Sequence, residues 1–121
     1  MSSVIVDTNI WINHFKNKNS VLEELLTEDR VVLHPFILGE LACGNLDRRA
    51  EILELFSWLP KSEILSEEEV LSFLASEKIY GKGLGWIDVH LLGAARISRA
   101  QLWTLDKALL KEAKRFSINF N

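Results

Sequence analysis

The sequence predicts an α/β fold in which helices cover both faces of a parallel sheet. Short apolar runs alternate with longer helical patterns along the 121-residue chain, and that alternation is typical of a parallel sheet with crossover helices. The first run, Val4-Ile5-Val6, is apolar throughout, as expected of a central strand buried on both faces. This length suits one core, so we expect one domain over residues 1–121.

The individual elements follow from local signals. Pro35 suits the first turn of a helix, and Gly44 suits its end. Ser66 and Glu69 have the spacing of a capping box. The expected strands are 4–6, 31–33, 63–65 and 102–104, with 117–120 as a candidate fifth. The expected helices are 10–16, 21–26, 35–43, 47–58, 66–80, 86–99 and 107–115.

Composition excludes several classes of protein. Hydrophobic residues make up 48% and charged residues 26% of the chain, which is typical of a globular protein and not of a disordered one. No apolar run reaches the roughly 20 residues that span a membrane. Cys43 is the one cysteine and is expected to be a small buried residue. It allows no disulfide framework, so a cytoplasmic location is expected.

Asp7 follows the central strand directly, in the run Val6-Asp7-Thr8-Asn9. Ligand sites in open α/β sheets lie at the carboxyl ends of such strands, so Asp7 is a candidate site residue. The alternative is that Asp7 caps the following helix. On the residues alone, both interpretations stay open.

Glu40 and Asp88 are acids within apolar helical segments. Glu40 lies between Gly39 and Leu41, beside the expected buried face, where an unpartnered carboxylate would be costly. Asp88 shares a helix face with Leu91, Leu92 and Ala95. A position in the first helical turn would explain why the charge of Asp88 is tolerated, but it would not explain why the side chain faces the core.

Asp106 follows the strand at 102–104, as Asp7 follows the first strand. On its own it is better explained as a helix cap. If the two strands are neighbours, however, Asp7 and Asp106 lie at one edge of the sheet. The helices that follow would then bring Glu40 and Asp88 from either side.

Four carboxylates in one cleft cannot all stay ionised without a counter-charge. Oxygen ligands favour Mg²⁺ or Mn²⁺, and two such ions about 4 Å apart can promote phosphodiester hydrolysis. The formal net charge is −3; without the four acids it would be +1, so the remaining surface tolerates phosphate. His14, His34 and His90 are scattered and are interpreted as structural or surface residues.

These segments together resemble the PIN-domain ribonucleases, and in particular the VapC toxins of toxin–antitoxin pairs. The resemblance rests on Val6-Asp7-Thr8-Asn9 with Trp11, on Glu40, on Asp88 within Trp86-Ile87-Asp88-Val89-His90-Leu91-Leu92, and on Thr104-Leu105-Asp106. It covers essentially the whole chain. It implies a three-layer α/β/α sandwich with a central parallel sheet, RNA cleavage dependent on Mg²⁺ or Mn²⁺, homodimers, and a VapB-type antitoxin.

The resemblance also implies roles for residues. Asp7, Glu40, Asp88 and Asp106 would carry the catalytic metal site, and Thr8, Asn9 and Thr104 would support it. Single-stranded loops are the expected class of RNA target. The basic residues considered for phosphate contact are Lys16, Lys18, Lys82, Arg96, Arg99 and Lys107.

Other classes of protein fit the residues less well. A phosphatase of the haloacid-dehalogenase type needs a second acid two residues after the first, where this chain has Asn9. A receiver domain needs an aspartate at the end of the third strand, where Leu65-Ser66 offers none. A binding module without catalysis remains an alternative, although it gives no reason for four acids to converge.

Overall fold

The computed structural model describes residues 2–121 and contains a parallel sheet of three strands. The strand order is β2-β1-β3, with β1 at Val4–Val6, β2 at Val31–Val32 and β3 at Gln101–Trp103. Ile5 pairs with Val32 on one side and with Leu102 on the other. All three residues of β1 are fully buried, because the strand lies in the middle of the sheet with helices on both faces.

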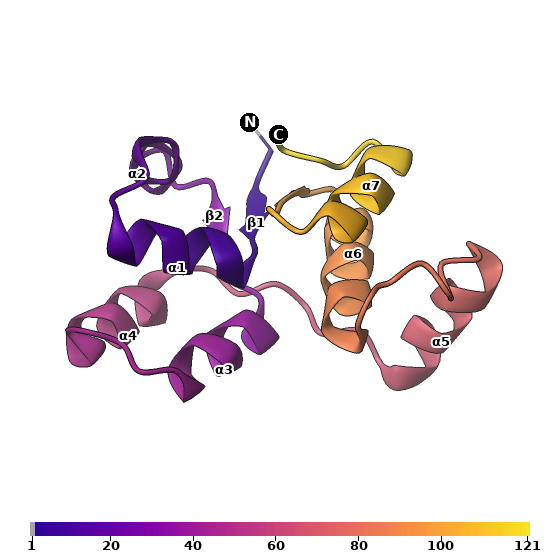
Figure 1. Ribbon diagram of the computed structural model, residues 1–121, viewed down its shortest axis with the longest axis horizontal. Helices are drawn as coiled ribbons and strands as arrows, with labels where there is room; N and C mark the ends of the chain where they lie inside the picture. The colour runs from indigo at the N-terminus through magenta and orange to yellow at the C-terminus, as the bar shows by residue number, and fades with distance from the viewer. Residues whose placement is uncertain (1) are drawn as a thin grey trace.

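Seven helices lie in the described part of the chain, on the two sides of the sheet. In Figure 1, α1 to α4 lie to the left of the strands and α5 to α7 to the right. The predicted α/β/α sandwich with a central parallel sheet is therefore confirmed. The helices are α1 Thr8–Lys16, α2 Ser20–Thr27, α3 Pro35–Cys43, α4 Arg49–Trp58, α5 Glu67–Ser76, α6 Trp86–Ser98 and α7 Lys107–Arg115.

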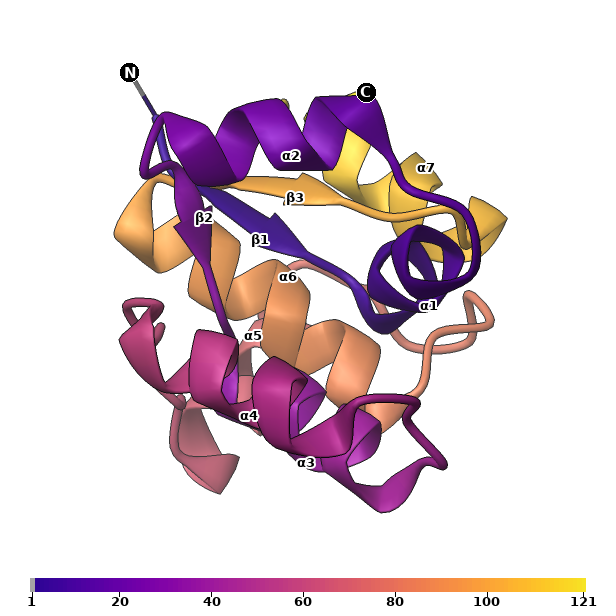
Figure 2. The same cartoon turned by 90° about the vertical axis from the view of Figure 1, so that its left-hand side faces the viewer.

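The winding of the chain places the carboxyl end of β1 at the point where the strand order reverses. From β1 the chain passes through α1 and α2 to β2, and it later returns through α6 to β3 on the other side of β1. Figure 2 shows β1 between these two strands. Connections that leave a central strand in opposite directions open a crevice at the strand ends, where ligands bind in such folds.

Two predicted strands are wrong in extent. Residues 63–65 form no strand; only Lys61, just before them, makes an isolated bridge with Leu33. Ile64 is half exposed there, so the run has neither a partner strand nor a buried face. In the segment 117–120 only Asn119 bridges, to Leu102. Short apolar runs become strands only where a neighbouring strand is available.

Helix ends follow the local signals, with one exception. Pro35 opens α3 and Gly44 is its C-cap, and Ser66 and Glu69 form both hydrogen bonds of the predicted capping box. The exception is α5, which ends at Ser76 and not near Tyr80. Lys78 has a φ of 53°, a left-handed conformation that helices do not continue through.

The core lies between the sheet and its helices and includes Trp11, Phe56 and Leu92, all fully buried. Cys43 was expected to be buried, and this expectation is wrong, because the residue is exposed at the end of α3. No helix in residues 2–121 combines the length and apolar character needed to cross a membrane.

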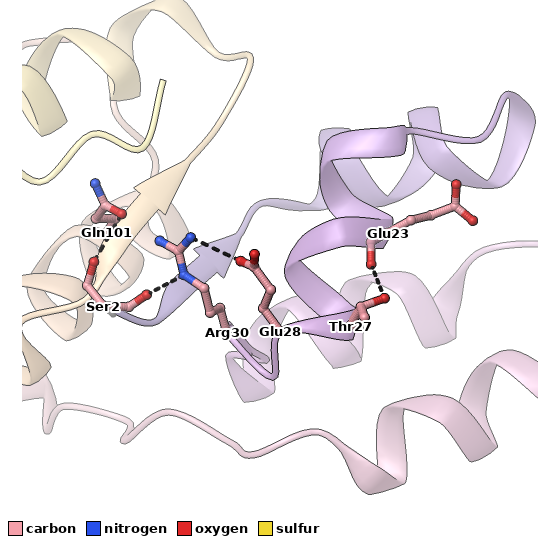
Figure 3. Close-up of polar contacts among 6 residues, drawn as sticks. All are labelled: Ser2, Glu23, Thr27, Glu28, Arg30 and Gln101. Carbon is pink, nitrogen blue, oxygen red and sulfur yellow. Dashed lines mark hydrogen bonds and ion pairs between the residues drawn. The ribbon is translucent and has the colours of Figure 1, made fainter.

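Polar contacts hold together the edge of the sheet at the amino ends of its strands (Figure 3). Arg30, just before β2, donates to the Ser2 carbonyl oxygen at 3.0 Å and lies 3.4 Å from Glu28. The Ser2 hydroxyl donates to Gln101 of β3 at 3.2 Å. These contacts join the starts of the three strands and leave the opposite edge to the acids.

Candidate active site

Asp7 is a buried carboxylate at the carboxyl end of the central strand. It is 6% exposed, and its backbone N–H donates to Trp103 O at 2.9 Å. This bond continues the β1–β3 ladder, so the ends of the two strands are fixed side by side. Asp7 is also the N-cap of α1, since its Oδ1 accepts from the Thr8 N–H at 2.8 Å.

Asp7, Asn9 and Thr104 form a hydrogen-bonded unit that we call the β1–β3 corner. The Thr104 hydroxyl donates to Asp7 Oδ2 at 2.7 Å, and Asn9 Nδ2 donates to the same oxygen at 3.3 Å. Asn9 Oδ1 accepts from the Leu105 N–H at 3.1 Å. Thr104 is fully buried, so the corner fixes the orientation of the Asp7 carboxylate.

Glu40 lies near the carboxyl end of α3, and its environment differs from the expected one. The residue is exposed, whereas the sequence pattern placed it beside a buried face without a partner. Its Oε1 accepts from the Thr8 hydroxyl at 2.8 Å. Thr8, which follows Asp7 directly, therefore connects the α3 acid to the N-terminus of α1.

Asp88 lies in the first turn of α6 and is half-buried. Its Oδ2 accepts from the Gly85 N–H at 3.0 Å, which satisfies a backbone donor at the helix start. Leu91, Leu92 and Ala95, which share its helix face, are all buried. The position in the first turn and the orientation toward the core therefore occur together.

Asp106 is the N-cap of α7 and is exposed. Its Oδ1 accepts from the Leu109 N–H at 2.9 Å. Its backbone N–H donates to Thr104 Oγ1 at 3.0 Å, so its connection to Asp7 passes through Thr104. The capping explanation that the sequence favoured is therefore correct for the side chain of Asp106.

The charges of Glu40 and Asp88 act on Asp7. Burial is the largest cause of a raised pKa at Asp7; hydrogen bonds from Thr104 and Thr8 lower this pKa, and the negative charges of Asp88 and Glu40 raise it. Repulsion among the acids was expected to raise at least one pKa. The direction is confirmed, although burial contributes more than repulsion does.

Capping and site formation are not alternatives here. Asp7, Asp88 and Asp106 each accept a backbone N–H in the first turn of a helix. The positive end of a helix dipole stabilises a carboxylate at that position. At Asp7 the backbone hydrogen bond from Thr8 at the start of α1 lowers the pKa and so offsets part of the effect of burial.

The side chains present have the donor chemistry of a magnesium or manganese site. They supply carboxylate and hydroxyl oxygens, the ligands that hard cations prefer. Burial of Asp7 next to two further negative charges is an arrangement that a cation would relieve. Within residues 2–121, however, no three His, Cys, Asp or Glu side chains are already arranged to hold an ion together.

Glu40 also borders a groove of about 890 Å³. We call it the α1–α4 groove; its walls include Ile12, Phe15, Glu40, Leu41, Ile52 and Leu55. Ile12 and Leu55 are 42% and 39% exposed. Its lining combines these apolar side chains with charged ones, among them the acids Glu40, Asp47 and Glu51. Such a mixture suits an amphipathic segment.

Two of the basic residues considered for phosphate contact already have acidic partners. Arg96 Nη1 lies 2.9 Å from Glu77 Oε1, and Lys82 Nζ lies 3.7 Å from the buried Glu112. His34 and His90 are buried, in agreement with a structural role. Each histidine stands alone within an apolar segment, so the sequence gave no indication that the two rings would lie near each other.

The chain matches known proteins over most of its length. The profile of the PIN domain matches residues 4–115, and the chain therefore belongs to the PIN-domain family. It is 37% identical to Ribonuclease VapC32 of Mycobacterium tuberculosis, in two strains, over 88% of this chain and 86% of that protein. The family resemblance stated from the sequence is confirmed.

A solved structure supports the same assignment. The fold is similar to a chain in the crystal structure of DNA-bound VapBC from Salmonella typhimurium, with a TM-score of 0.59 and 26% sequence identity. The match covers 86% of this chain and 85% of that chain. The fold class expected from the sequence therefore agrees with an experimental structure.

Proposed function

We propose that this protein is the toxin of a toxin–antitoxin pair and acts as a metal-dependent endoribonuclease on RNA phosphodiester bonds. The observation that carries the proposal is the buried Asp7 at the carboxyl end of the central strand, with Glu40 bonded to the adjacent Thr8; the negative charges of Asp88 and Glu40 both raise the pKa of Asp7. The 37% identity to Ribonuclease VapC32 supports the ribonuclease assignment. The whole chain would act as one nuclease domain.

Asp7, Glu40 and Asp88 would hold the principal Mg²⁺ or Mn²⁺, and Asp106 would help to hold a second ion after rotating from its capping position. Bound there, the ions would supply Lewis-acid activation of the phosphate and of the nucleophilic water. The protein contributes fixed orientation. Thr104 and Thr8 hold the Asp7 carboxylate, the Thr8 hydroxyl holds Glu40, and the Gly85 N–H holds Asp88.

Substitution of Asp88 by asparagine tests this assignment. Asp88→Asn keeps an oxygen for the Gly85 N–H but removes a charge, so we expect RNA cleavage to fall by about 100-fold or more with an unchanged melting temperature. Glu68→Gln on α5 is the matched control, because Glu68 is also an acid in the first turn of a helix. Full cleavage by purified Asp88→Asn would contradict the metal site.

The partner we propose is a VapB-type antitoxin whose amphipathic helix occupies the α1–α4 groove. One wall of this groove comes from α1 and the other from α3 and α4 with the segment between them, and α2 contributes none of the lining residues. Because Glu40 lines the groove, a basic side chain of the partner could pair with this acid and compete with the metal.

Growth and binding assays test the partner. Expression of this chain alone should arrest growth, and co-expression of the antitoxin encoded beside it should relieve the arrest. Leu55→Asp should weaken the complex without reducing cleavage, whereas Leu71→Asp, at an exposed leucine of α5, should change neither. Harmless expression of the folded, active chain would contradict the toxin assignment.

We further propose a homodimer that acts in the cytoplasm, where its RNA target is found. Light scattering on the purified chain tests the oligomeric state directly. A mass of one chain at micromolar concentration would contradict the dimer and leave the nuclease proposal intact.

A further inference from the structure

Two buried histidines lie between the helices that carry Glu40 and Asp88. His34 follows β2, is the N-cap of α3 and is fully buried; His90 is on α6, two residues after Asp88, and is 3% exposed. Their ring centroids are 6.4 Å apart, with ring planes at 65°. Both rings therefore lie in the interior, one at the start of α3 and the other on α6.

The helix cap of α3 determines the tautomer of His34. Its Nδ1 accepts from the Phe36 N–H at 3.0 Å, so that nitrogen carries no proton. Burial, with His90 as a second cause, lowers the pKa of His34 to about 4, and the ring is neutral near pH 7. The one proton of a neutral imidazole must then be on Nε2.

That Nε2–H donor has no hydrogen-bond partner among the described residues, and neither has Nδ1 of His90. A buried polar atom left unpaired costs about 1–3 kcal/mol, so two such atoms on neighbouring rings call for an explanation. A direct hydrogen bond between the rings is absent, because bonds of this kind need about 2.7–3.2 Å between nitrogens.

We propose that one ordered water bridges His34 Nε2–H and His90 Nδ1, and that this bridge makes both histidines positioning residues for Glu40 and Asp88. The 6.4 Å between ring centroids is too long for a direct bond between ring nitrogens, and one water that bonds to both rings can close a gap of this order. The consequence for Glu40 and Asp88 rests on the proposed nuclease function. The bridge itself rests on the two unpaired nitrogens.

The chemistry favours water over a metal ion at this place. A histidine that accepts at Nδ1 keeps its proton on Nε2 and has no lone pair there for a metal. Water can accept the Nε2–H and donate to Nδ1 of His90, which satisfies both nitrogens. The alternative of a histidine metal site would require His34 to give up the cap of α3.

Aromatic packing encloses the pair and fixes which helices it joins. The His90 ring makes T-shaped contacts with Phe36 of α3 at 4.7 Å and with Trp86 of α6 at 5.0 Å between centroids. Edge-to-face packing tolerates sliding more readily than a directed hydrogen bond does. The water bridge would therefore set the register of α3 against α6, and hence the spacing of Glu40 and Asp88.

Nuclear magnetic resonance on the wild-type protein tests the bridge without reference to nuclease activity. We expect a slowly exchanging Nε2 proton on His34, an unprotonated Nδ1 on His90, and cross-relaxation between the His34 proton and a bound water. A proton on Nδ1 of His34, or no bound water at the Nε2 proton, would overturn the bridge even if the protein cleaves RNA.

Kinetics test the positioning role. His34→Asn keeps a side-chain oxygen for the Phe36 N–H but lacks Nε2, and His90→Phe keeps the aromatic packing but lacks Nδ1. Each should lower kcat about 10- to 100-fold, with an unchanged KM for RNA and a higher Mn²⁺ requirement. The double variant should be no worse than either single variant, because both break one bridge.

The control removes a buried unpaired atom elsewhere. Ser62 Oγ is also buried without a partner, so Ser62→Ala should leave kcat and the Mn²⁺ requirement unchanged. Unchanged kcat in both histidine variants, or losses that multiply in the double variant, would overturn the positioning role. An inactive wild-type protein would instead contradict the proposed function, and the resonance experiment would still decide the bridge.

Discussion

The two halves of the candidate site differ in rigidity. The β1–β3 corner holds a 6% exposed Asp7 and a fully buried Thr104 in a closed set of hydrogen bonds. On the opposite side, Glu40 is exposed, has the Thr8 hydroxyl as its side-chain contact, and borders the α1–α4 groove. We call the β1–β3 corner the closed half of the candidate site, and Glu40 with the α1–α4 groove the open half. Asp7 in the closed half is thus held in place before anything binds, whereas Glu40 in the open half can rotate toward an ion or a partner.

This difference should appear most strongly when each acid is neutralised. Asp7→Asn and Glu40→Gln should both reduce RNA cleavage by about 100-fold or more, because each removes a proposed ligand. Only Asp7→Asn should leave the metal-free protein as stable as the wild type or more stable, since it removes a buried charge whose pKa is raised.

Urea unfolding without metal measures the stability half of this comparison. Glu40→Gln should stay within about 0.5 kcal/mol of wild type, as exposed substitutions usually do. If Asp7→Asn instead destabilised the protein by much more than Glu40→Gln, the charge of Asp7 would be stabilising and the contrast would fail.

Lowering the pH should destabilise the folded protein through His34, the N-cap of α3, which is the helix that carries Glu40. Its folded pKa is about 4, below the unfolded value of 6.5, so as the pH falls from 6.5 the unfolded chain binds a proton that the folded chain does not. This costs up to roughly 3 kcal/mol by pH 4. The lowered pKa of His90 acts in the same direction, while the raised pKa of Asp7 opposes both.

Thermal unfolding between pH 7 and pH 4 measures this effect, with His34→Asn as the comparison. The variant should lose less stability over that range than the wild type. Equal losses in the two proteins would mean that His34 is protonated in the folded state.

The closed half should depend on the hydroxyl of Thr104. Thr104→Val keeps the shape of the side chain but leaves Asp7 Oδ2 and the Asp106 N–H without this partner, so we expect a loss of about 1–3 kcal/mol in urea unfolding. Thr27→Val is the control, because that exposed hydroxyl bonds only to Glu23 O at 3.0 Å (Figure 3). Similar losses in both variants would contradict a special role for the corner.

Metal should give the smallest shift in the wild type. Mn²⁺ that binds only the folded state stabilises it by mass action and so raises the melting temperature. The free energy of unfolding rises by about 2.7 kcal/mol at an Mn²⁺ concentration 100 times the dissociation constant, and by less at lower concentrations. A rise of a few degrees at millimolar Mn²⁺ is expected, and none in Asp7→Asn. Calorimetry without a shift in the wild type would count against the site.

The sequence predicted the closed half well because its signals are local. A strand is followed by an acid and a helix at Val6-Asp7-Thr8, and again at Trp103-Thr104-Leu105-Asp106 before α7. Two neighbouring parallel strands bring such ends together. The capping explanation for Asp7 and Asp88 was set against a site role, yet the structure combines capping with convergence. One carboxylate oxygen can cap while the other faces the site.

The open half was harder to predict because it depends on packing between distant elements. Most helical glutamates are solvated, and the exposure of Glu40 follows that rule although its apolar neighbours in the sequence argued for burial. No local pattern indicates that α4, and not α2, would line the groove. The pairing of His34 with His90 joins residues 56 positions apart through ring contacts, which no periodic pattern encodes. The false strand at 63–65 has the same origin, since strand formation requires a partner that the run itself does not specify.

Gly93 is the point where α6 packs most closely on the segment around Leu65 and Phe73. A Cβ atom at this position would lie 2.6 Å from Leu65 Cδ1 and 3.5 Å from Phe73, so the helix rests directly on the 65–73 region at its middle and carries Asp88 at its end. A methyl group at position 93 would force the Leu65 side chain or the helix itself to shift. The close packing that holds the helix carrying Asp88 therefore depends on a residue that takes no part in the proposed site.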